Sequence, residues 1–254
     1  MKNMDGIRLE HIYKSYTTLS TDVILDHAER PATTRTVLKD LSLTIPAGLL
    51  TVIVGRSGCG KSTLLKLLSG KETMDSGRLT LPEGWHTALL SPEPYVITWT
   101  SVLRNVELAV GAGFTQEQRR EVAEKLVKLV KLNDFADLTP VELSTGMRQR
   151  LGLARVLASQ AELLLMDEPF AALDFITRAE LQTELLNIQN EMRRTIVLVT
   201  HQLEEALLLA QRIVVMHADS AVKEFDLSAL SYPRDLASDA LQALKATVTE
   251  ECKK

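Results

Sequence analysis

The chain has 254 residues, of which 45% are hydrophobic and 24% are charged, and its formal net charge is −4. This balance is typical of an ordinary folded soluble protein, and without a basic excess it does not favour nucleic acid as a partner. No hydrophobic run approaches the roughly 20 residues that span a bilayer, and the polar first residues indicate no signal peptide. Two cysteines, Cys59 and Cys252, make no disulfide framework, so we expect a reducing, cytoplasmic setting.

The first part of the chain reads mainly as strands. Residues 7–16 alternate in hydrophobicity and are expected to form an edge strand, followed by a polar loop or insertion at residues 17–35. A second strand is expected at residues 37–45, closed by a Pro-Ala-Gly turn at residues 46–48. The short hydrophobic run at residues 49–54 predicts a buried strand.

The middle of the chain changes character. Residues 91–156 are rich in Glu, Lys, Arg and Leu at helical spacing, and hydrophobic residues within 119–132 fall on one helical face. We therefore expect a mainly helical subdomain here. The residues on that face are Val122, Leu126, Leu129 and Val130.

Strand patterns return in the last third of the chain, at residues 163–166, 196–199 and 213–216. Helical patterns at residues 178–191 and 202–211 separate these strands. Strands and helices that alternate in this way imply a parallel sheet wrapped by helices.

Residues 55–62 read Gly-Arg-Ser-Gly-Cys-Gly-Lys-Ser and match the phosphate-loop pattern G-x-x-x-x-G-K-[ST], between a predicted strand and a predicted helix at residues 61–69. The glycines let the backbone curl so that successive N–H groups point at phosphate oxygens. Lys61 is expected to reach the β- and γ-phosphates, and the Ser62 hydroxyl to bind Mg²⁺. By itself the motif indicates only a nucleotide phosphate, because kinases, GTPases and many ATPases share it; a chance glycine-rich turn is the alternative. The residues expected to bind ATP here are Gly55, Ser57, Gly58, Cys59, Gly60, Lys61, Ser62 and Thr63.

Two acidic residues and a histidine follow predicted strands downstream. Asp167 and Glu168 come after the strand at residues 163–166, at the edge where parallel sheets bind ligands. Asp167 is expected to hold Mg²⁺ through water, and Glu168 to orient the attacking water and accept its proton. His201 follows the next strand and is expected near the γ-phosphate. In a chain without a phosphate loop, the acidic pair would indicate only a strand that ends in a solvated turn. The alternative for His201 is a surface residue that caps the next helix.

Several motifs, in order, resemble those of ABC ATPases. Residues 143–150, Leu-Ser-Thr-Gly-Met-Arg-Gln-Arg, resemble the signature segment of that family, and the run Ala-Ala-Leu-Asp that ends at Asp174 resembles its D-loop. His201 is similar to the switch histidine of the family. Tyr16 is similar to the aromatic residue that stacks on adenine, and Tyr13 competes for that role.

The resemblance covers residues 7–216 and implies an α/β fold, a P-loop NTPase of the ABC ATPase type. Such a fold has a RecA-like parallel sheet core, an N-terminal antiparallel β subdomain and an inserted helical subdomain. We expect the ABC ATPase domain to span residues 1–220, with the helical subdomain at about 91–156. The C-terminal tail at residues 221–254, helix-prone at 236–246, has no role that the sequence reveals.

The resemblance also implies partners and a mechanism. Two copies, expected to be identical, would dock head to tail, with ATP between the phosphate loop of one copy and the signature segment of the other. Closure on ATP would drive transmembrane permease subunits, with a solute-binding protein involved indirectly. The chain would then lie on the inner face of the cell membrane. The signature residues expected to contact ATP of the other copy are Ser144, Thr145, Gly146 and Met147.

Residues 146–150 and 99–106 further resemble the importer ATPases for nitrate, aliphatic sulfonates and taurine. We therefore expect ATP-driven import of a small anion, although the partner proteins select the solute. The aromatic cluster around Tyr95 and Trp99 is expected to receive the permease, with core packing as the alternative. Two other functions stay open: a degenerate nucleotide-binding subunit with little turnover, and a non-transport ABC ATPase that acts on DNA or the ribosome.

Two positions depart from the family pattern. Pro92 stands where the family has a glutamine that contacts Mg²⁺, and proline has neither an amide side chain nor a backbone N–H. Ser91 and Glu93 are the candidates to supply an oxygen instead. Thr145 stands where glycine is usual, and a β-branched residue does not easily take φ > 0 and crowds an approaching phosphate. We therefore expect hydrolysis to survive but to be slow or strongly dependent on the permease.

Overall fold

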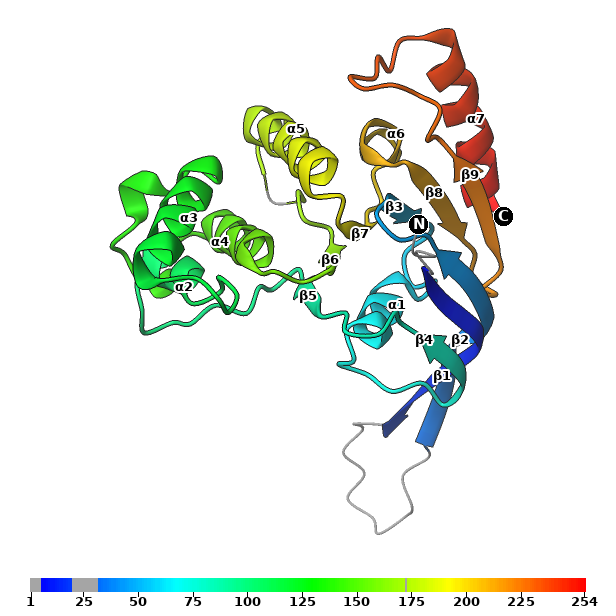
Figure 1. Cartoon of the computed structure of the whole chain (residues 1–254). Helices are drawn as coiled ribbons and strands as arrows, with labels where there is room; N and C mark the ends of the chain where they lie inside the picture. The colour runs from blue at the N-terminus through cyan, green and yellow to red at the C-terminus, as the bar shows by residue number, and fades with distance from the viewer. Residues whose placement is uncertain (1–5, 20–31, 172) are drawn as a thin grey trace, which may run out of the picture.

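The computed structural model describes residues 6–19, 32–171 and 173–254, and it contains two sheets with helices packed around them (Figure 1). The strands are β1 (Ile7–Leu19), β2 (Ala32–Ile45), β3 (Leu50–Val54), β4 (Ser76–Thr80), β5 (Thr87–Leu90), β6 (Leu163–Asp167), β7 (Thr195–Val199), β8 (Arg212–Met216) and β9 (Val222–Asp226). The helices are α1 (Lys61–Leu68), α2 (Val102–Glu107), α3 (Gln116–Leu129), α4 (Thr145–Ala158), α5 (Phe175–Met192), α6 (Leu203–Leu209) and α7 (Asp239–Lys253), with 3-10 turns at Asn133–Phe135 and Pro140–Glu142. One sheet has the strand order β5-β6-β7-β3-β8-β9, and the other has the order β2-β1-β4.

The six-stranded sheet is the centre of the fold. Every residue of β3, β6 and β7 is buried, and these strands run parallel to β5 and β8. Because successive side chains point to opposite faces, Val52 joins the hydrophobic core that contains α4, α5 and α6, whereas Ile53 joins the core that contains α1 and the three-stranded sheet. Burial on both faces explains the continuous hydrophobic runs, and the predicted parallel sheet wrapped by helices is confirmed.

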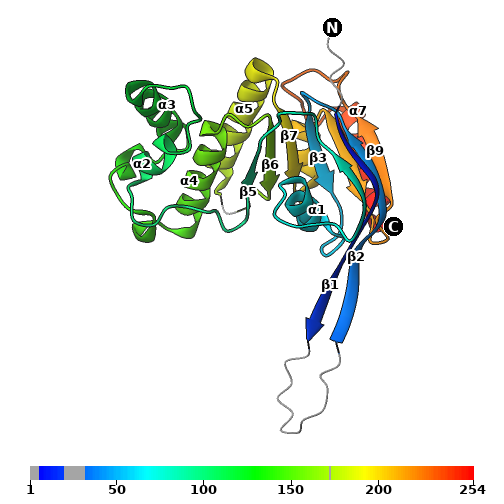
Figure 2. The ribbon, with the colours of Figure 1, turned by 60° about the horizontal axis from the view of Figure 1, so that its bottom comes forward.

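The three-stranded sheet corrects the predicted place of the first strand. β1 pairs antiparallel with both β2 and β4, so residues 7–16 form a central strand and not an edge strand. Strand pairing also extends into the expected loop at residues 17–35, where Thr17 Oγ1 lies 3.1 Å from Thr34 Oγ1. This hairpin projects from the body of the molecule (Figure 2). Its residues are mostly polar and do not alternate in hydrophobicity, so the sequence does not predict a strand here. Residues 20–31 of the predicted insertion lie outside the described residues.

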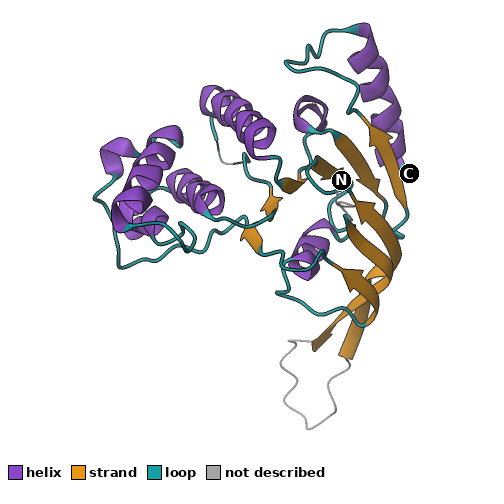
Figure 3. Ribbon diagram, viewed as in Figure 1, coloured by secondary structure: helices purple, strands orange, loops and turns teal. Residues whose placement is uncertain are grey.

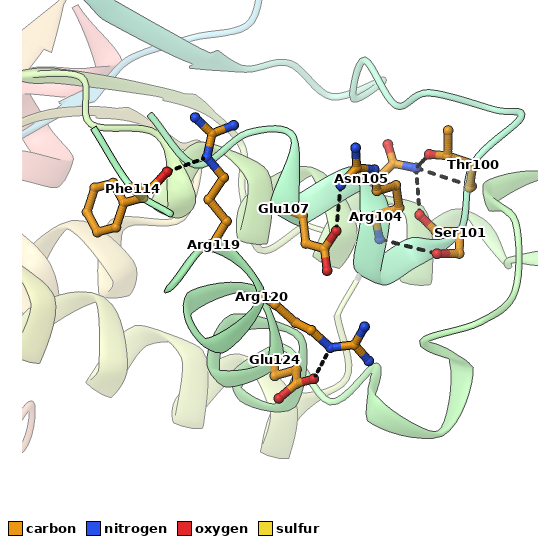
Figure 4. A network of polar contacts seen from close by, with 9 residues as sticks. All are labelled: Thr100, Ser101, Arg104, Asn105, Glu107, Phe114, Arg119, Arg120 and Glu124. Carbon is orange, nitrogen blue, oxygen red and sulfur yellow. Dashed lines mark hydrogen bonds and ion pairs between the residues drawn. The ribbon is translucent and has the colours of Figure 1, made fainter. Parts of the chain in front are cut away.

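Helices α2, α3 and α4 pack against one another in a helical lobe beside the sheets (Figure 3). The buried Asn105 fixes the loop that leads into this lobe, because its Oδ1 accepts a hydrogen bond from the Ile97 N–H at 2.8 Å. Its Nδ2 donates to the Ile97 carbonyl at 2.9 Å. The same Nδ2 also donates to Thr100 Oγ1 at 2.9 Å (Figure 4). The expected helical subdomain is thus present, and side-chain to backbone hydrogen bonds fix its entry.

The C-terminal segment packs against the main sheet. Residues 222–226 form β9, which pairs antiparallel with β8, and α7 packs against α6 and β8. Lys245 Nζ lies 2.7 Å from Glu204 Oε1, and His217 Nε2 lies 3.2 Å from Glu251 Oε1. The stretch for which the sequence revealed no role therefore extends the sheet and covers α6. Within the described part of the chain, no helix combines the length and hydrophobicity that crossing a membrane requires.

Candidate nucleotide-binding and hydrolysis site

The predicted phosphate loop lies between the buried strand β3 and helix α1. Gly58 and Gly60 have φ values of 81° and 105°, in a region that strains residues with a side chain. A Cβ atom at Gly55 would lie only 2.3 Å from the carbonyl oxygen of Met216, so only glycine fits this approach to β8. The backbone of the neighbouring strand β8 thus fixes the conformation of the loop. The loop leads into the N-terminus of α1, which is a favourable place for an anion. The other predicted residues, Ser57, Cys59, Ser62 and Thr63, lie in the loop or in the first turn of α1.

Lys61 is buried inside the curl of this loop. Its Nζ donates hydrogen bonds to the carbonyl oxygens of Gly55 at 2.8 Å and Arg56 at 3.0 Å, and it lies 3.8 Å from Cys59 Sγ. The ammonium group therefore adds a full positive charge beside the partial charges of the backbone N–H groups. This combination suits a multiply charged phosphate.

Asp167 ends β6 and is buried. Burial raises the pKa of its carboxyl group and the charge of Glu168 acts in the same direction, whereas a hydrogen bond with Ser62 and the charge of Lys61 oppose the rise. The structure thus brings together the hydroxyl and the carboxylate that the sequence predicted as metal-binding groups. Oxygen donors of these two kinds are ligands that Mg²⁺ accepts.

Glu168 follows β6 directly and has a φ of 49°, which is uncommon for a residue with a side chain. Its N–H donates a hydrogen bond to the carbonyl oxygen of Val199 at 2.9 Å, which ties it to the end of β7. Its Oε2 lies 2.8 Å from Nδ1 of His201. Two residues that the sequence placed after separate strands therefore meet at one edge of the sheet.

The signature segment opens helix α4 in the helical lobe, whereas the phosphate loop lies between the sheets and α1 (Figure 1). Ser144 caps α4, since its Oγ accepts a hydrogen bond from the Met147 N–H at 3.3 Å. Thr145 is the first residue of the helix and does not have a positive φ, so the expected backbone strain at this position is wrong. The reason is that the cap at Ser144 lets the helix start at Thr145. Ser144 and Thr145 are exposed, and Gly146 is half-buried.

Tyr16 lies close to the phosphate loop. It pairs across the strands with Arg35, whose Nη2 lies 3.4 Å from the position that a Cβ atom on Gly58 would take. The Tyr16 hydroxyl is buried without a hydrogen-bond partner among the described residues. Tyr13, the alternative for the adenine, pairs with Ser76 on the other side of β1. This register favours Tyr16 as the aromatic residue beside the loop.

Asp174 caps helix α5, where its Oδ1 accepts a hydrogen bond from the Thr177 N–H at 3.0 Å. That hydrogen bond lowers the pKa of Asp174. The next two residues, Phe175 and Ile176, are 83% and 66% exposed. An exposed aromatic and aliphatic pair of this kind suits contact with another protein. Ala172 of the predicted D-loop lies outside the described residues.

Two buried polar residues at the site were not predicted. Gln149, in α4, donates a hydrogen bond from Nε2 to the carbonyl oxygen of Glu168 at 2.9 Å. Glu205, in α6, accepts a hydrogen bond from Thr200 Oγ1 at 2.7 Å, and burial raises the pKa of its carboxyl group. In the sequence, each of these two residues can be recognised only as a polar residue on the buried face of a helix. That pattern does not identify the group with which the side chain forms a hydrogen bond.

A small cavity of about 100 Å³ lies beside the predicted metal-binding residues, and its wall includes Ser62, Asp167, Ser91 and Pro92. The Ser91 hydroxyl is buried, and no residue that the structure describes hydrogen-bonds to it. Glu93 is exposed and does not line the cavity. Of the two oxygen donors that the sequence left open, the geometry favours Ser91.

A larger cavity of about 830 Å³ lies where β5 faces the helical lobe, and Tyr95 lines it. Tyr95 is 73% exposed, and Lys71 Nζ lies 3.8 Å from the centre of its ring. Trp99 is 82% exposed. Core packing, the alternative, is therefore wrong for these two aromatic side chains, since each of them is largely exposed.

Residues 38–171 match the sequence family described as ABC transporter. The chain belongs to this family. It is 41% identical over 210 residues to the aliphatic sulfonates import ATP-binding protein SsuB of Granulibacter bethesdensis, a match that covers 83% of this chain and 85% of that protein. It is also 38% identical over 210 residues to the taurine import ATP-binding protein TauB of Pseudomonas aeruginosa, over 80% of each chain. The bicarbonate transport ATP-binding protein CmpD of Synechocystis sp. is 38% identical over 213 residues, which cover 79% of this chain and 75% of that one.

Solved structures of ABC proteins share the fold. A dimeric post-hydrolysis state of the ATP-binding cassette MJ0796 bound to ADP and Pi matches with a TM-score of 0.73 at 25% identity, over 87% of this chain and 98% of that one. A second dimeric structure of the same cassette, described as a bacterial ABC transporter cassette, has a TM-score of 0.73 and 26% identity. The expected α/β fold of the ABC ATPase type is therefore confirmed.

Proposed function

We propose that this chain is the ATP-binding and hydrolysing subunit of an ABC importer for a small anion such as nitrate, a sulfonate or taurine. The observation that carries the proposal is the meeting of Asp167, Glu168 and His201 at one edge of the sheet that also holds the phosphate loop. The names of the related import proteins support the direction of transport and the class of solute. The experiment that tests the proposal is ATP hydrolysis with Glu168→Gln as the inactive control.

Within this proposal, Ser62 and Asp167 would hold Mg²⁺, which would neutralise charge on the phosphates of ATP. The residues present fit the ion, because one small cavity is lined by a buried carboxylate and two hydroxyls, one of which has no hydrogen-bond partner in the described part of the chain. Lys61 binds the phosphates, and Glu168 orients the attacking water and accepts its proton. His201, whose Nδ1 lies 2.8 Å from Glu168 Oε2, would position the carboxylate and is placed to contact the γ-phosphate.

Ser91 takes the place of the missing glutamine in this scheme. Ser91→Ala is expected to weaken the apparent affinity for Mg²⁺ by about three- to tenfold, because it removes one oxygen donor and roughly 1 kcal/mol of interaction. The measurement is a Mg²⁺ titration of nucleotide binding. Glu93→Ala, at the exposed neighbour, serves as the control and should leave the titration unchanged. A larger effect at Glu93 than at Ser91 would contradict this assignment.

The functional unit in this proposal is a dimer of identical chains. The exposed Ser144 and Thr145, at the start of α4, would contact the γ-phosphate of ATP bound to the other copy, together with Gly146 and Met147. Asp174 and the exposed residues after it would lie at the same interface. The known dimers of the ABC cassette MJ0796 support this arrangement.

The permease is proposed to dock on the exposed aromatic residues Tyr95 and Trp99, the first of which lines the larger cavity. Closure and opening of the dimer would then move the permease between its inward- and outward-facing states, as a population shift driven by ATP binding. In this setting the chain lies on the cytoplasmic face of the membrane, and a solute-binding protein acts through the permease.

Turnover is proposed to be slow, because the side chain of Thr145 occupies the place where the phosphate of the other copy would approach. Thr145→Gly is expected to raise the rate of ATP hydrolysis by roughly two- to tenfold, which corresponds to a barrier lower by about 0.4–1.4 kcal/mol. Thr145→Ser, which keeps the hydroxyl and removes the methyl group, should give an intermediate rate if crowding is the cause. An unchanged or lower rate in Thr145→Gly would contradict the crowding argument.

A degenerate nucleotide-binding subunit is the second candidate function, and the proline at position 92 is the observation that favours it. Such a subunit would bind ATP without phosphate release even when it is reconstituted with its permease. A non-transport ABC ATPase would instead co-purify with nucleic acid or ribosomes and not with a membrane protein.

A further inference from the structure

Gln149 is the point at which the signature helix contacts the residue proposed to activate water. It lies in α4, it is 5% exposed, and its Nε2 donates a hydrogen bond at 2.9 Å to the main-chain carbonyl of Glu168, 19 residues away. A buried amide that bonds a backbone carbonyl from another element fixes the distance between the two elements. Here the two elements are the helix that starts at the ATP-binding signature segment and the segment that follows β6.

The backbone of Glu168 has a conformation that its neighbours must maintain. Its φ is 49°, which residues with a side chain rarely adopt and which persists only where surrounding contacts impose it. The Glu168 N–H donates a hydrogen bond to the carbonyl oxygen of Val199, and the carboxylate Oε2 lies 2.8 Å from Nδ1 of His201, so both of these contacts come from the end of β7. The hydrogen bond from Gln149, in contrast, comes from the helical lobe.

Helix α4 also contacts the segment that leads to the proposed permease surface. A Cβ atom on Gly152 would lie 2.4 Å from Pro94 Cβ, so the helix packs closely on this segment. Arg155 Nη1 donates a hydrogen bond to the carbonyl oxygen of Tyr95 at 2.7 Å. A single rigid helix therefore contacts the backbone of the exposed Tyr95 near one end and Glu168 nearer the other.

We propose that Gln149 is a positioning residue that holds the Glu168 backbone in its left-handed conformation and transmits movements of α4 to the carboxylate. The proposal rests on the proposed role of Glu168 in hydrolysis. A shift of α4, caused by the permease or by ATP of the other copy at Ser144, moves the Gln149 amide and with it the carbonyl of Glu168. In a chain with proline at position 92, this hydrogen bond links the helical lobe to the hydrolytic residues directly.

The test compares two buried glutamines that make the same kind of hydrogen bond. Gln149→Met keeps the length of the side chain and removes the donor. Gln189→Met is the matched control, because Gln189 is 3% exposed and its Nε2 donates to the carbonyl oxygen of Gly48 at 2.8 Å, before β3 begins. Both variants lose one buried hydrogen bond, so both are expected to show a similar, modest fall in Tm. ATP hydrolysis and binding of a non-hydrolysable ATP analogue are measured on the full chain reconstituted with its permease subunits.

Gln149→Met is expected to lower kcat by about tenfold or more while KM and the affinity for the analogue change by less than about twofold, because misplacement of a catalytic group acts on the rate. Gln189→Met is expected to keep kcat within about twofold. If Gln149→Met does not fold, Gln149→Asn, which keeps the amide but is one methylene shorter, should show the same selective loss of kcat. Equal kcat values for Gln149→Met and Gln189→Met, or a loss of analogue binding in proportion to the rate, would overturn the proposal.

A Glu168→Gln variant in the same series separates this proposal from the one on which it rests. Full hydrolysis by Glu168→Gln would show that the assignment of Glu168 is wrong, and the role of Gln149 would fall with it. Loss of hydrolysis in Glu168→Gln together with normal kcat in Gln149→Met would leave the proposed function intact and reject only the positioning role.

Discussion

Glu168→Gln is expected to lower the rate of ATP hydrolysis by roughly 10²- to 10⁴-fold, the range that a general base contributes, while ATP still binds. The amide keeps the size of the side chain, but it cannot accept a proton from water. The measurement is Mg²⁺-dependent phosphate release over a range of protein concentrations, with ATP binding measured separately. Phosphate release that rises faster than linearly with concentration would indicate that two copies form the active unit.

The control for this variant is Glu162→Gln, at the opposite end of the same strand. Glu162 accepts a hydrogen bond from the His86 N–H at 2.8 Å, and its side chain is 45% exposed. Its replacement should leave the rate within about twofold of the unchanged chain, because surface substitutions of this kind have small effects. Equal rates for Glu168→Gln and the unchanged chain would reject Glu168 as the base. If the unchanged chain binds ATP but releases no phosphate even with its permease, the degenerate-subunit alternative would hold.

Gly55→Ala is expected to abolish ATP binding and to lower the free energy of unfolding by about 2–4 kcal/mol. The added Cβ atom would lie 2.3 Å from the carbonyl oxygen of Met216, and a backbone carbonyl in a buried strand cannot rotate away as a flexible side chain can. Either β8 or the phosphate loop must shift, and a shifted loop no longer aims its N–H groups at the phosphates. Denaturant unfolding and nucleotide binding measure the two effects.

Gly84→Ala distinguishes this clash from the general cost of replacing glycine. Gly84 has a φ of 78°, and a Cβ atom there would meet no atom within 4 Å. Its replacement therefore costs only the left-handed backbone conformation, about 1–2 kcal/mol, and should leave ATP binding unchanged. If Gly55→Ala cost no more than Gly84→Ala and retained ATP binding, the phosphate loop would not be fixed by β8 in the way that we describe.

The strands show which structural features the sequence predicts and which it does not. The strands predicted around residues 49–54 and 163–166 were found because strands that are buried on both faces consist of consecutive hydrophobic residues. The alternation at residues 7–16 predicts an edge strand, yet β4 pairs with β1 through backbone hydrogen bonds. Alternation of side chains reports which face of a strand is buried, and it carries no information on how many neighbours the backbone has.

The sequence by itself determined the family and the positions of the phosphate loop, Asp167, Glu168 and His201 along the chain, because a short run with fixed spacing is enough to bring each of these to the end of a strand or the start of a helix. Only the tertiary structure decided that His201 contacts Glu168, that Gln149 holds the Glu168 carbonyl, and that Thr145 is helical and unstrained. The physical reason is that these features depend on how separate elements pack against one another. The type of a residue and its spacing along the chain do not specify which atoms of a distant segment it contacts.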